Sequence, residues 1–197
     1  MRWLEIRRHS LTKEGVDRGH GSELSARGVA LARAAGTGLG QISYVVTSAA
    51  PRAMETAIAM GCSVDEAVHL PSCYVPGEVA KHEQWSWPRP YVRYAELLSH
   101  ATGLAAAARV HEAVWTQTVN AVPEGATALV VCHGGAIEPT LVACLPNAAH
   151  ASWGGPFAHC DGARLGFHGS RFVTIRFRRV SAVPAAPEPE ADTEPAT

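Results

Sequence analysis

Three short polar clusters contain the residues of this 197-residue chain whose types and spacing best suit chemistry. Arg8 and His9 lie in "RRHS", Arg52 lies in "TSAAPR", and His133 lies in "CHGG". Each cluster follows a short apolar run that is typical of a buried strand. In open parallel sheets, ligands bind beyond the carboxyl ends of the strands. The sequence therefore predicts one site that contains two arginines and two histidines.

Such a cationic site suits a phosphoryl group. Cations gathered in a pocket lose hydration and repel each other, and a bound anion removes that cost. An arginine guanidinium donates two parallel hydrogen bonds to phosphate oxygens. Gly134 and Gly135 follow His133, and they let a ligand approach the start of a helix, where an anion is favoured. The pattern indicates phosphoryl transfer, which depends mainly on positioning and charge neutralisation.

Each cluster taken alone also has an ordinary structural interpretation. His9 would be a hydrogen-bonded histidine at a strand end, Arg52 a solvated surface arginine, and His133 an incidental residue of a tight turn. An Arg-His pair is weak by itself and needs structural context. The functional interpretation depends on the three clusters meeting.

The elements that must position these residues alternate between strand and helix. Strands are expected over residues 3–8, 42–48 and 127–133. Helices are expected from residue 24 or 25 to 36–40, from 51 to 61 and from 134 to 146, with one or two more within 91–122. Residues 62–90 are expected to form a loop, and a hairpin is expected around Gly169 and Ser170. This order predicts a three-layer α/β/α sandwich with a mostly parallel central sheet.

Composition predicts one folded domain over residues 1–180 and a disordered Pro/Ala/Glu-rich tail over 181–197. A net charge of −1 argues against nucleic acid or an anionic membrane as a partner. Five cysteines without a C-x-x-C pair predict reduced thiols and no zinc site. The start "MRWLEIRRHS" lacks the apolar core of a signal peptide, and no apolar run is long enough to span a membrane, so a cytoplasmic protein is expected.

The three clusters together resemble the sequence blocks of a known family. "RRHSLT", "TSAAPRAMETA" and "VVCHGGAIEP" are similar, in this order, to R-H-G-x-T, S-S-x-x-x-R-A-x-Q-T-A and V-x-H-G-G-x-I of the histidine phosphatase superfamily. That superfamily includes the cofactor-dependent phosphoglycerate mutases. The resemblance spans about residues 3–146 and implies a phosphoglycerate mutase-like fold.

The resemblance also implies catalytic roles. His9 would be the nucleophile and would form a phosphohistidine, for which its attacking nitrogen must be unprotonated. Arg8, Arg52 and His133 would hold the phosphoryl oxygens, and Thr12 would add a hydroxyl donor. Neither a metal nor a cofactor is implied.

A general acid is needed to protonate an alcohol leaving group. The stretch "YVPGEVAKHEQW" resembles the loose E-x-x-x-G-x-W region of the family, and this makes Glu78 the first candidate for the acid. Glu83 is the alternative.

Three departures from the family pattern refine the prediction. Ser10 replaces a glycine, and Arg7 replaces an apolar residue. Arg7 is expected either to line the pocket or, as the favoured explanation, to pair with a carboxylate such as Glu5. The Trp-Asn pair of the mutases is absent after the first block, which favours a phosphatase. We therefore expect a metal-independent phosphomonoesterase of the histidine acid phosphatase type.

Two alternatives remain open from the sequence, namely a mutase-like phosphotransferase and a catalytically silent phospho-ligand-binding module. The substrate is expected to be a small-molecule phosphoester or a phosphorylated protein. The sequence does not indicate the oligomeric state.

Overall fold

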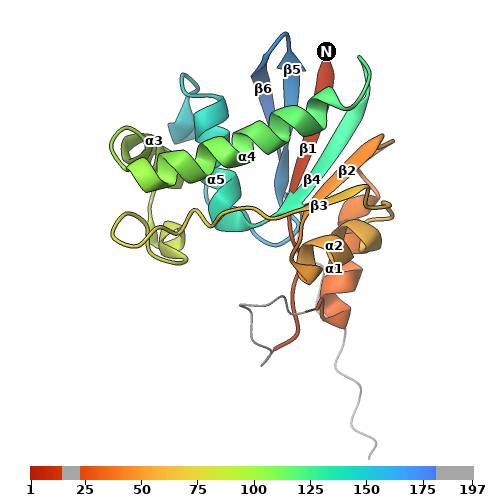
Figure 1. Cartoon of the computed structure of the whole chain (residues 1–197). Coiled ribbons are helices and arrows are strands. Elements are labelled where there is room, and N and C mark those ends of the chain that lie inside the picture. The colour runs from red at the N-terminus through yellow and green to blue at the C-terminus, as the bar shows by residue number, and fades with distance from the viewer. Residues whose placement is uncertain (15–22, 181–197) are drawn as a thin grey trace, which may run out of the picture.

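The computed structural model describes residues 1–14 and 23–180 (Figure 1). The tail predicted over 181–197 lies outside the described residues. Within them, no helix is both long enough and apolar enough to cross a membrane.

A six-stranded mixed sheet forms the centre of the fold, with the strand order β3-β2-β4-β1-β5-β6. The strands are β1 (Arg2–Arg8), β2 (Tyr44–Ser48), β3 (Glu66–Val68), β4 (Thr127–Cys132), β5 (Gly162–His168) and β6 (Arg171–Arg178). The first four strands of that order pair in parallel, whereas β5 and β6 add an antiparallel edge. The mostly parallel sheet is therefore confirmed, as is the hairpin at Gly169 and Ser170.

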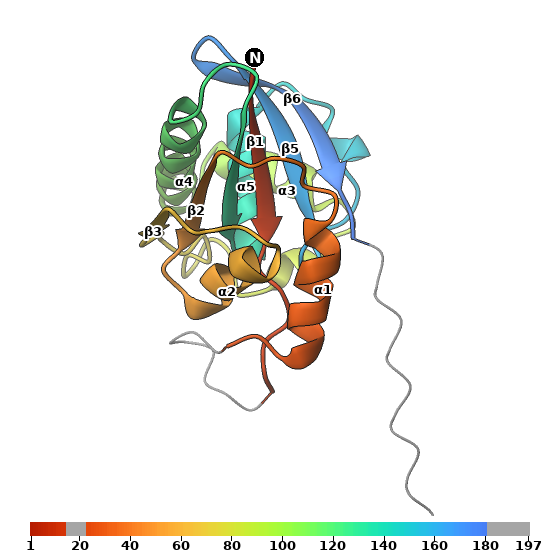
Figure 2. The same cartoon turned by 90° about the vertical axis from the view of Figure 1, so that its right-hand side faces the viewer.

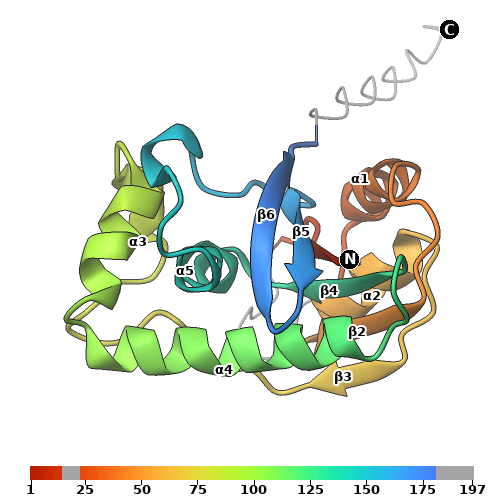
Figure 3. The ribbon, with the colours of Figure 1, turned by 90° about the horizontal axis from the view of Figure 1, so that it is seen from above.

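Helices cover both faces of this sheet and make the three predicted layers (Figures 2 and 3). The helices are α1 (Ala26–Gly36), α2 (Pro51–Ala59), α3 (Pro90–Leu98), α4 (Thr102–Asn120) and α5 (Gly134–Cys144). Helices α1 and α2 lie on one face, and α3, α4 and α5 lie on the other. Two short 3-10 helices are η2 (Glu83–Ser86) and η3 (His150–Ser152).

Strand β4 lies between two hydrophobic cores. Leu129 and Val131 pack on the side of α1 and α2, whereas Ala128 and Val130 pack on the side of α4 and α5. A parallel strand that is buried on both faces must be apolar on both. This explains why the sequence of β4 is continuously apolar rather than alternating.

The prediction of an unbroken loop over residues 62–90 is wrong, because this region contains β3 and η2. Strand β3 has only three residues and lies at the sheet edge, so it is too short to show a period-2 pattern. Long-range contacts hold it in place. The backbone N–H of Val45 donates to the Asp65 carboxylate at 2.8 Å, and that of Ala49 donates to the Val68 carbonyl at 2.8 Å.

Helix α1 fixes the chain directly after β1. Its N-cap is Ser25, whose hydroxyl accepts a hydrogen bond from the Gly28 N–H at 3.0 Å. A Cβ on Gly28 would lie only 2.0 Å from the Leu11 carbonyl oxygen. Glycine is therefore required for this close approach, which places the segment after His9 against α1.

Candidate active site

The three polar clusters meet at one cavity of about 670 Å³. Strand β4 lies between β1 and β2 and pairs in parallel with both. The carboxyl ends of the three strands therefore lie at the same edge of the sheet. Arg8 pairs with Cys132, so the next residues, His9 and His133, lie side by side with ring centroids 5.2 Å apart. The cavity is lined by Arg8, His9, Thr12, Arg52, Leu70, Pro71, Ser72, Cys73, Tyr74, Lys81, His82, His133, Gly134, Gly135, Ala136 and His159.

His9 is held with one ring nitrogen available. Its Nδ1 lies 2.8 Å from the Ser10 carbonyl oxygen. Because a carbonyl only accepts hydrogen bonds, Nδ1 carries the proton and Nε2 keeps its lone pair. Burial lowers the pKa of His9 well below its ordinary value, and the neighbouring His133, Arg8 and Arg52 lower it further. A neutral imidazole with a free Nε2 is a competent nucleophile for phosphorus.

Ser10 makes one hydrogen bond that a glycine would lack, from its hydroxyl to the Gly28 carbonyl at 2.7 Å. Its backbone N–H also donates to the Thr56 hydroxyl at 2.9 Å. Thr56 donates in turn to the Arg52 carbonyl at 2.6 Å. The residue after the candidate nucleophile is thus tied to both α1 and α2.

His133 holds Arg52 through one ring nitrogen and Ser48 through the other. Nδ1 lies 3.3 Å from Nη2 of Arg52, and Nε2 lies 2.8 Å from the Ser48 hydroxyl oxygen. A guanidinium only donates, so Nδ1 accepts and Nε2 carries the proton. Burial, together with the charge of Arg52, lowers the pKa of His133 to about 3. His133 is therefore neutral, and Ser48 is a site residue that sequence reasoning missed although it stands within the second cluster.

Arg8 bridges the cavity and the segment that precedes β5. Its Nη1 donates to the Phe157 carbonyl oxygen, and its Nη2 lies 3.5 Å from Nε2 of His159. The guanidinium also lies 5.6 Å from the centroid of the Trp85 ring. A Cβ on Gly134 would come within 3.1 Å of the Arg8 Nε, so the glycine after His133 leaves room for this arginine.

Arg7 points to the opposite face of β1 and does not line the cavity. Its Nη2 lies 2.8 Å from a carboxylate oxygen of Glu5, and its Nη1 donates to the Cys160 carbonyl at 3.1 Å. Its expected pairing with Glu5 is confirmed.

The two candidate general acids lie elsewhere. The carboxylate of Glu78 accepts hydrogen bonds from the backbone N–H groups of Gly103 at 2.9 Å and Leu104 at 2.6 Å, at the start of α4. The carboxylate of Glu83 accepts one from the Ala80 N–H at 2.8 Å. Neither glutamate is among the lining residues. The catalytic role of Glu78 stays a prediction that these contacts do not favour.

The cavity also gathers residues that sequence reasoning did not assign to it, namely Tyr74, Lys81, His82 and His159. The hydroxyl of Tyr74 accepts a hydrogen bond from the Gln84 side chain at 2.9 Å. A Cβ on Gly135 would lie 2.2 Å from the Tyr74 ring, so this glycine lets Tyr74 pack over the start of α5. The sequence feature that could have indicated their role is the high density of basic and aromatic residues after position 70.

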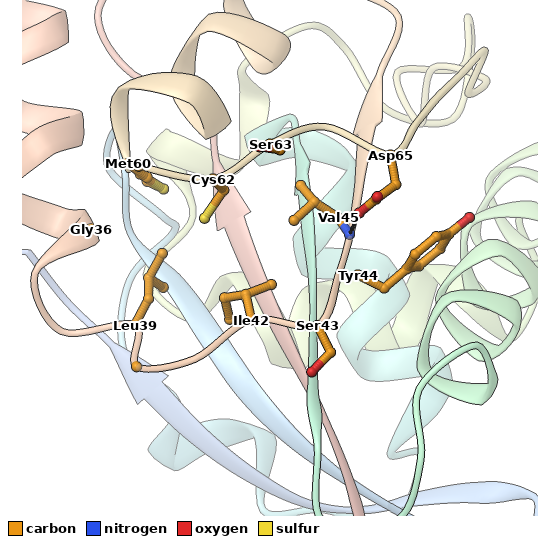
Figure 4. A pocket seen from close by; sticks show the side chains of 12 residues that line it. Gly36, Leu39, Ile42, Ser43, Tyr44, Val45, Met60, Cys62, Ser63 and Asp65 are labelled. Atoms are coloured by element: carbon orange, nitrogen blue, oxygen red, sulfur yellow. Dashed lines mark hydrogen bonds between the residues drawn. The ribbon is translucent and has the colours of Figure 1, made fainter.

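Metal ligation receives no support from the described part of the chain, where no three His, Cys, Asp or Glu side chains cluster suitably. A second pocket of about 330 Å³ lies near the start of β2 (Figure 4). Its lining includes Cys62, Ser63 and Asp65 but no histidine or arginine, and the Asp65 carboxylate is bonded to the Val45 N–H. This pocket lacks the groups that phosphoryl chemistry needs.

The sequence matches no protein-family model and no curated protein. Solved structures match over nearly the whole chain. Phosphoserine phosphatase from Entamoeba histolytica, in complex with 3-phosphoglyceric acid, aligns with a TM-score of 0.63 and 15% identity, covering 90% of this chain and 96% of its own. Bacillus stearothermophilus YhfR aligns with a TM-score of 0.55 and 21% identity, covering 87% and 94%.

A mycobacterial glucosyl-3-phosphoglycerate phosphatase in complex with VO3 aligns with a TM-score of 0.52 and 22% identity, covering 92% of this chain and 100% of its own. These likenesses show the α/β fold that the sequence resemblance implies. The chain has the phosphoglycerate mutase-like α/β fold of these structures.

Proposed function

We propose that this protein is a phosphomonoesterase that works through a phosphohistidine at His9. The observation that carries the proposal is the state of His9 in the cavity wall, with its proton on Nδ1 and its Nε2 unprotonated, beside Arg8 and Arg52. The named similar structures, a phosphoserine phosphatase and a glucosyl-3-phosphoglycerate phosphatase, support hydrolysis of phosphomonoesters.

The reaction takes two displacements at phosphorus. Nε2 of His9 attacks, the phosphorus–nitrogen bond forms, and the ester oxygen leaves with its electron pair. Water then attacks phosphorus, and the phosphorus–nitrogen bond breaks to return the pair to Nε2. Arg8 and Arg52 neutralise the phosphoryl oxygens in both transition states, and the Thr12 hydroxyl donates to one of them.

Metal independence belongs to the proposal because the two arginines supply the positive charge that a metal ion supplies in other phosphatases. The substrate is proposed to be a small-molecule phosphoester or a phosphorylated protein. Lys81 at the cavity wall favours a substrate with a further anionic group beyond the phosphate.

Hydrolysis of p-nitrophenyl phosphate between pH 5 and pH 8, with excess chelator, tests the proposal. We expect turnover by the wild type and a loss of about 10³-fold or more in His9→Ala, because the nucleophile is removed. His100→Ala is the matched control, since His100 is exposed and lies outside the cavity. Activity that persists in His9→Ala would overturn the mechanism.

The two alternatives give different outcomes in the same assay. A mutase-like phosphotransferase would need a bisphosphate to prime His9 and would release little free phosphate. A silent phospho-ligand-binding module would bind vanadate or phosphate without turnover. Either result would contradict the phosphatase proposal and favour the corresponding alternative.

A further inference from the structure

We propose that His159 is the catalytic residue that protonates the leaving oxygen and then activates the attacking water. This proposal rests on the phosphatase function proposed above. An alkoxide is a poor leaving group, so hydrolysis of an alkyl phosphate gains about 10²- to 10⁴-fold from a positioned acid. The residue that supplies this acid must line the cavity.

The carboxyl groups of the described residues do not meet this requirement, because the cavity lining contains neither aspartate nor glutamate. Both carboxylate oxygens of Glu78 accept backbone N–H groups at the start of α4. The titratable groups that line the cavity are His9, His82, His133, His159, Lys81, Tyr74 and Cys73, together with the two arginines.

Among these groups, His159 has the position that a proton donor needs. Its ring centroid lies 5.5 Å from that of His9, nearly as close as the 5.2 Å between His9 and His133. His133 is committed through both ring nitrogens to Arg52 and Ser48. His82 lies on the cavity wall against Tyr74, with 3.4 Å between its Nδ1 and the Tyr74 hydroxyl.

The backbone directly after His159 is hydrogen-bonded to the end of the strand that carries the proposed nucleophile. The N–H of Arg8 donates to the Asp161 carbonyl at 2.8 Å, and the N–H of Cys160 donates to the Arg8 carbonyl at 3.2 Å. Cys160 adopts a positive φ of 61°, which turns the chain at this point. His159 is therefore held by the residue that precedes His9.

The Asp161 carboxylate secures the other side of the same turn. It accepts hydrogen bonds from the Ala158 N–H at 3.0 Å and the Val180 N–H at 2.7 Å, and it pairs with Arg179 at 3.0 Å. Arg179 also donates to the Gly155 carbonyl at 2.6 Å and to the Pro156 carbonyl at 2.9 Å. A catalytic group gains from such rigid support, because small displacements reduce proton transfer.

The protonation state follows from the charges in the cavity. Nη2 of Arg8 lies 3.5 Å from the Nε2 of His159, and this cation disfavours an imidazolium while the cavity holds no anion. A dianionic ester bound between Arg8 and Arg52 offsets their charge and favours the imidazolium. Binding of the substrate therefore favours protonation of His159, and this proton is the one transferred to the leaving oxygen.

The proton balance is complete over the two steps. As phosphorus transfers to Nε2 of His9, the ester oxygen leaves with its electron pair and takes the proton of the His159 imidazolium. The resulting alcohol departs, and His159 is neutral. It then takes a proton from water as the water oxygen attacks phosphorus, which regenerates the imidazolium.

A comparison of leaving groups tests this role. We expect His159→Asn to lower kcat/KM about 10²-fold or more for β-glycerol phosphate, whose leaving group needs a proton, and less than about 10-fold for p-nitrophenyl phosphate. His82→Asn and Glu78→Gln are the matched controls, and each is expected to change both substrates by the same factor. Thermal unfolding of every variant checks that the fold is retained.

Chemical rescue adds a second measurement. Free imidazole is expected to restore part of the alkyl phosphate activity of His159→Ala and none of that of His82→Ala. An equal loss on both substrates in His159→Asn, or a selective loss in His82→Asn or Glu78→Gln, would overturn the proposal for His159 while leaving the phosphatase function intact. A wild type that is silent on p-nitrophenyl phosphate would overturn both.

Discussion

Three imidazoles at one cavity take different states because their partners differ. A carbonyl holds the proton of His9 on Nδ1, a guanidinium holds the proton of His133 on Nε2, and His159 contacts Arg8. Since a histidine ring offers one donor and one acceptor when neutral, the partner of one nitrogen decides the chemistry of the other. The neighbours of each ring, rather than the residue type, therefore distinguish the proposed nucleophile, the positioning histidine and the proposed proton donor.

The state of His133 predicts a pH-dependent stability. Its pKa is about 3 in the folded chain and ordinarily 6.5, so below pH 6.5 the unfolded chain binds a proton that the folded chain does not. Stability therefore falls as pH falls, by about 2 kcal/mol between pH 7 and pH 5. Urea unfolding of wild type and His133→Gln at both pH values measures the contribution of His133 to this change in the free energy of unfolding. The same pH dependence in the two proteins would contradict it.

The contact of Ser48 with His133 predicts an effect on activity. Ser48→Ala leaves the Nε2 proton of His133 without its acceptor, so the ring loses the orientation that supports Arg52. We expect kcat/KM for p-nitrophenyl phosphate to fall about 10-fold, the equivalent of one hydrogen bond of about 1.4 kcal/mol. Ser63→Ala, in the second pocket, is the control and should keep full activity. A fully active Ser48→Ala would show that the orientation of His133 does not matter.

At the scale of elements, the sheet and two helix starts build the site. Strands β1 and β4 align His9 with His133, α2 places Arg52 after β2, and α5 begins at Gly134 so that Arg8 fits beside it. These positions follow from local patterns, and the sequence predicted the three strand ends and the helices after them. It left open whether residues 91–122 form one helix or two, because an alanine-rich stretch hides the break between Leu98 and Thr102.

The start of α4 predicts a structural role for Glu78. The N-cap residue Ala101 has no side-chain acceptor, and Glu78 supplies one from a distant loop. Glu78→Ala should lower the free energy of unfolding by about 1 kcal/mol, as the loss of a helix cap does. Chemical denaturation checks this against Glu14→Ala, an exposed control. A variant as stable as the wild type would contradict this structural role, and Glu78 would again be a candidate for the general acid.

At the scale of the whole molecule, residues far apart in the chain complete the cavity. The turn that carries His159 is fixed by Arg8 near one end of the described chain and by Arg179 near the other. Such long-range contacts have no local sequence signature, and His159 therefore could not be assigned from sequence. By contrast, Arg7 was placed correctly, because alternation along β1 puts it beside Glu5.

These contacts predict where the folded domain ends. A chain that ends after Val180 is expected to keep the unfolding midpoint and activity of the full chain. A chain that ends after Arg178 loses the bonds of Arg179 and Val180 to Asp161 and should lose about 2 kcal/mol of stability. Denaturant unfolding of both chains measures the difference. Equal stabilities would contradict the role of these two residues in holding the turn.

Trapping the phosphoryl group on the enzyme tests the central claim most directly. Wild type is mixed with p-nitrophenyl phosphate and excess chelator, quenched in alkali within a turnover, and mapped by mass spectrometry. We predict an acid-labile phosphoryl group on the peptide that contains His9, and none in His9→Ala. Turnover without a phosphoryl group on His9, or with the group on another residue such as Ser10, would contradict the account.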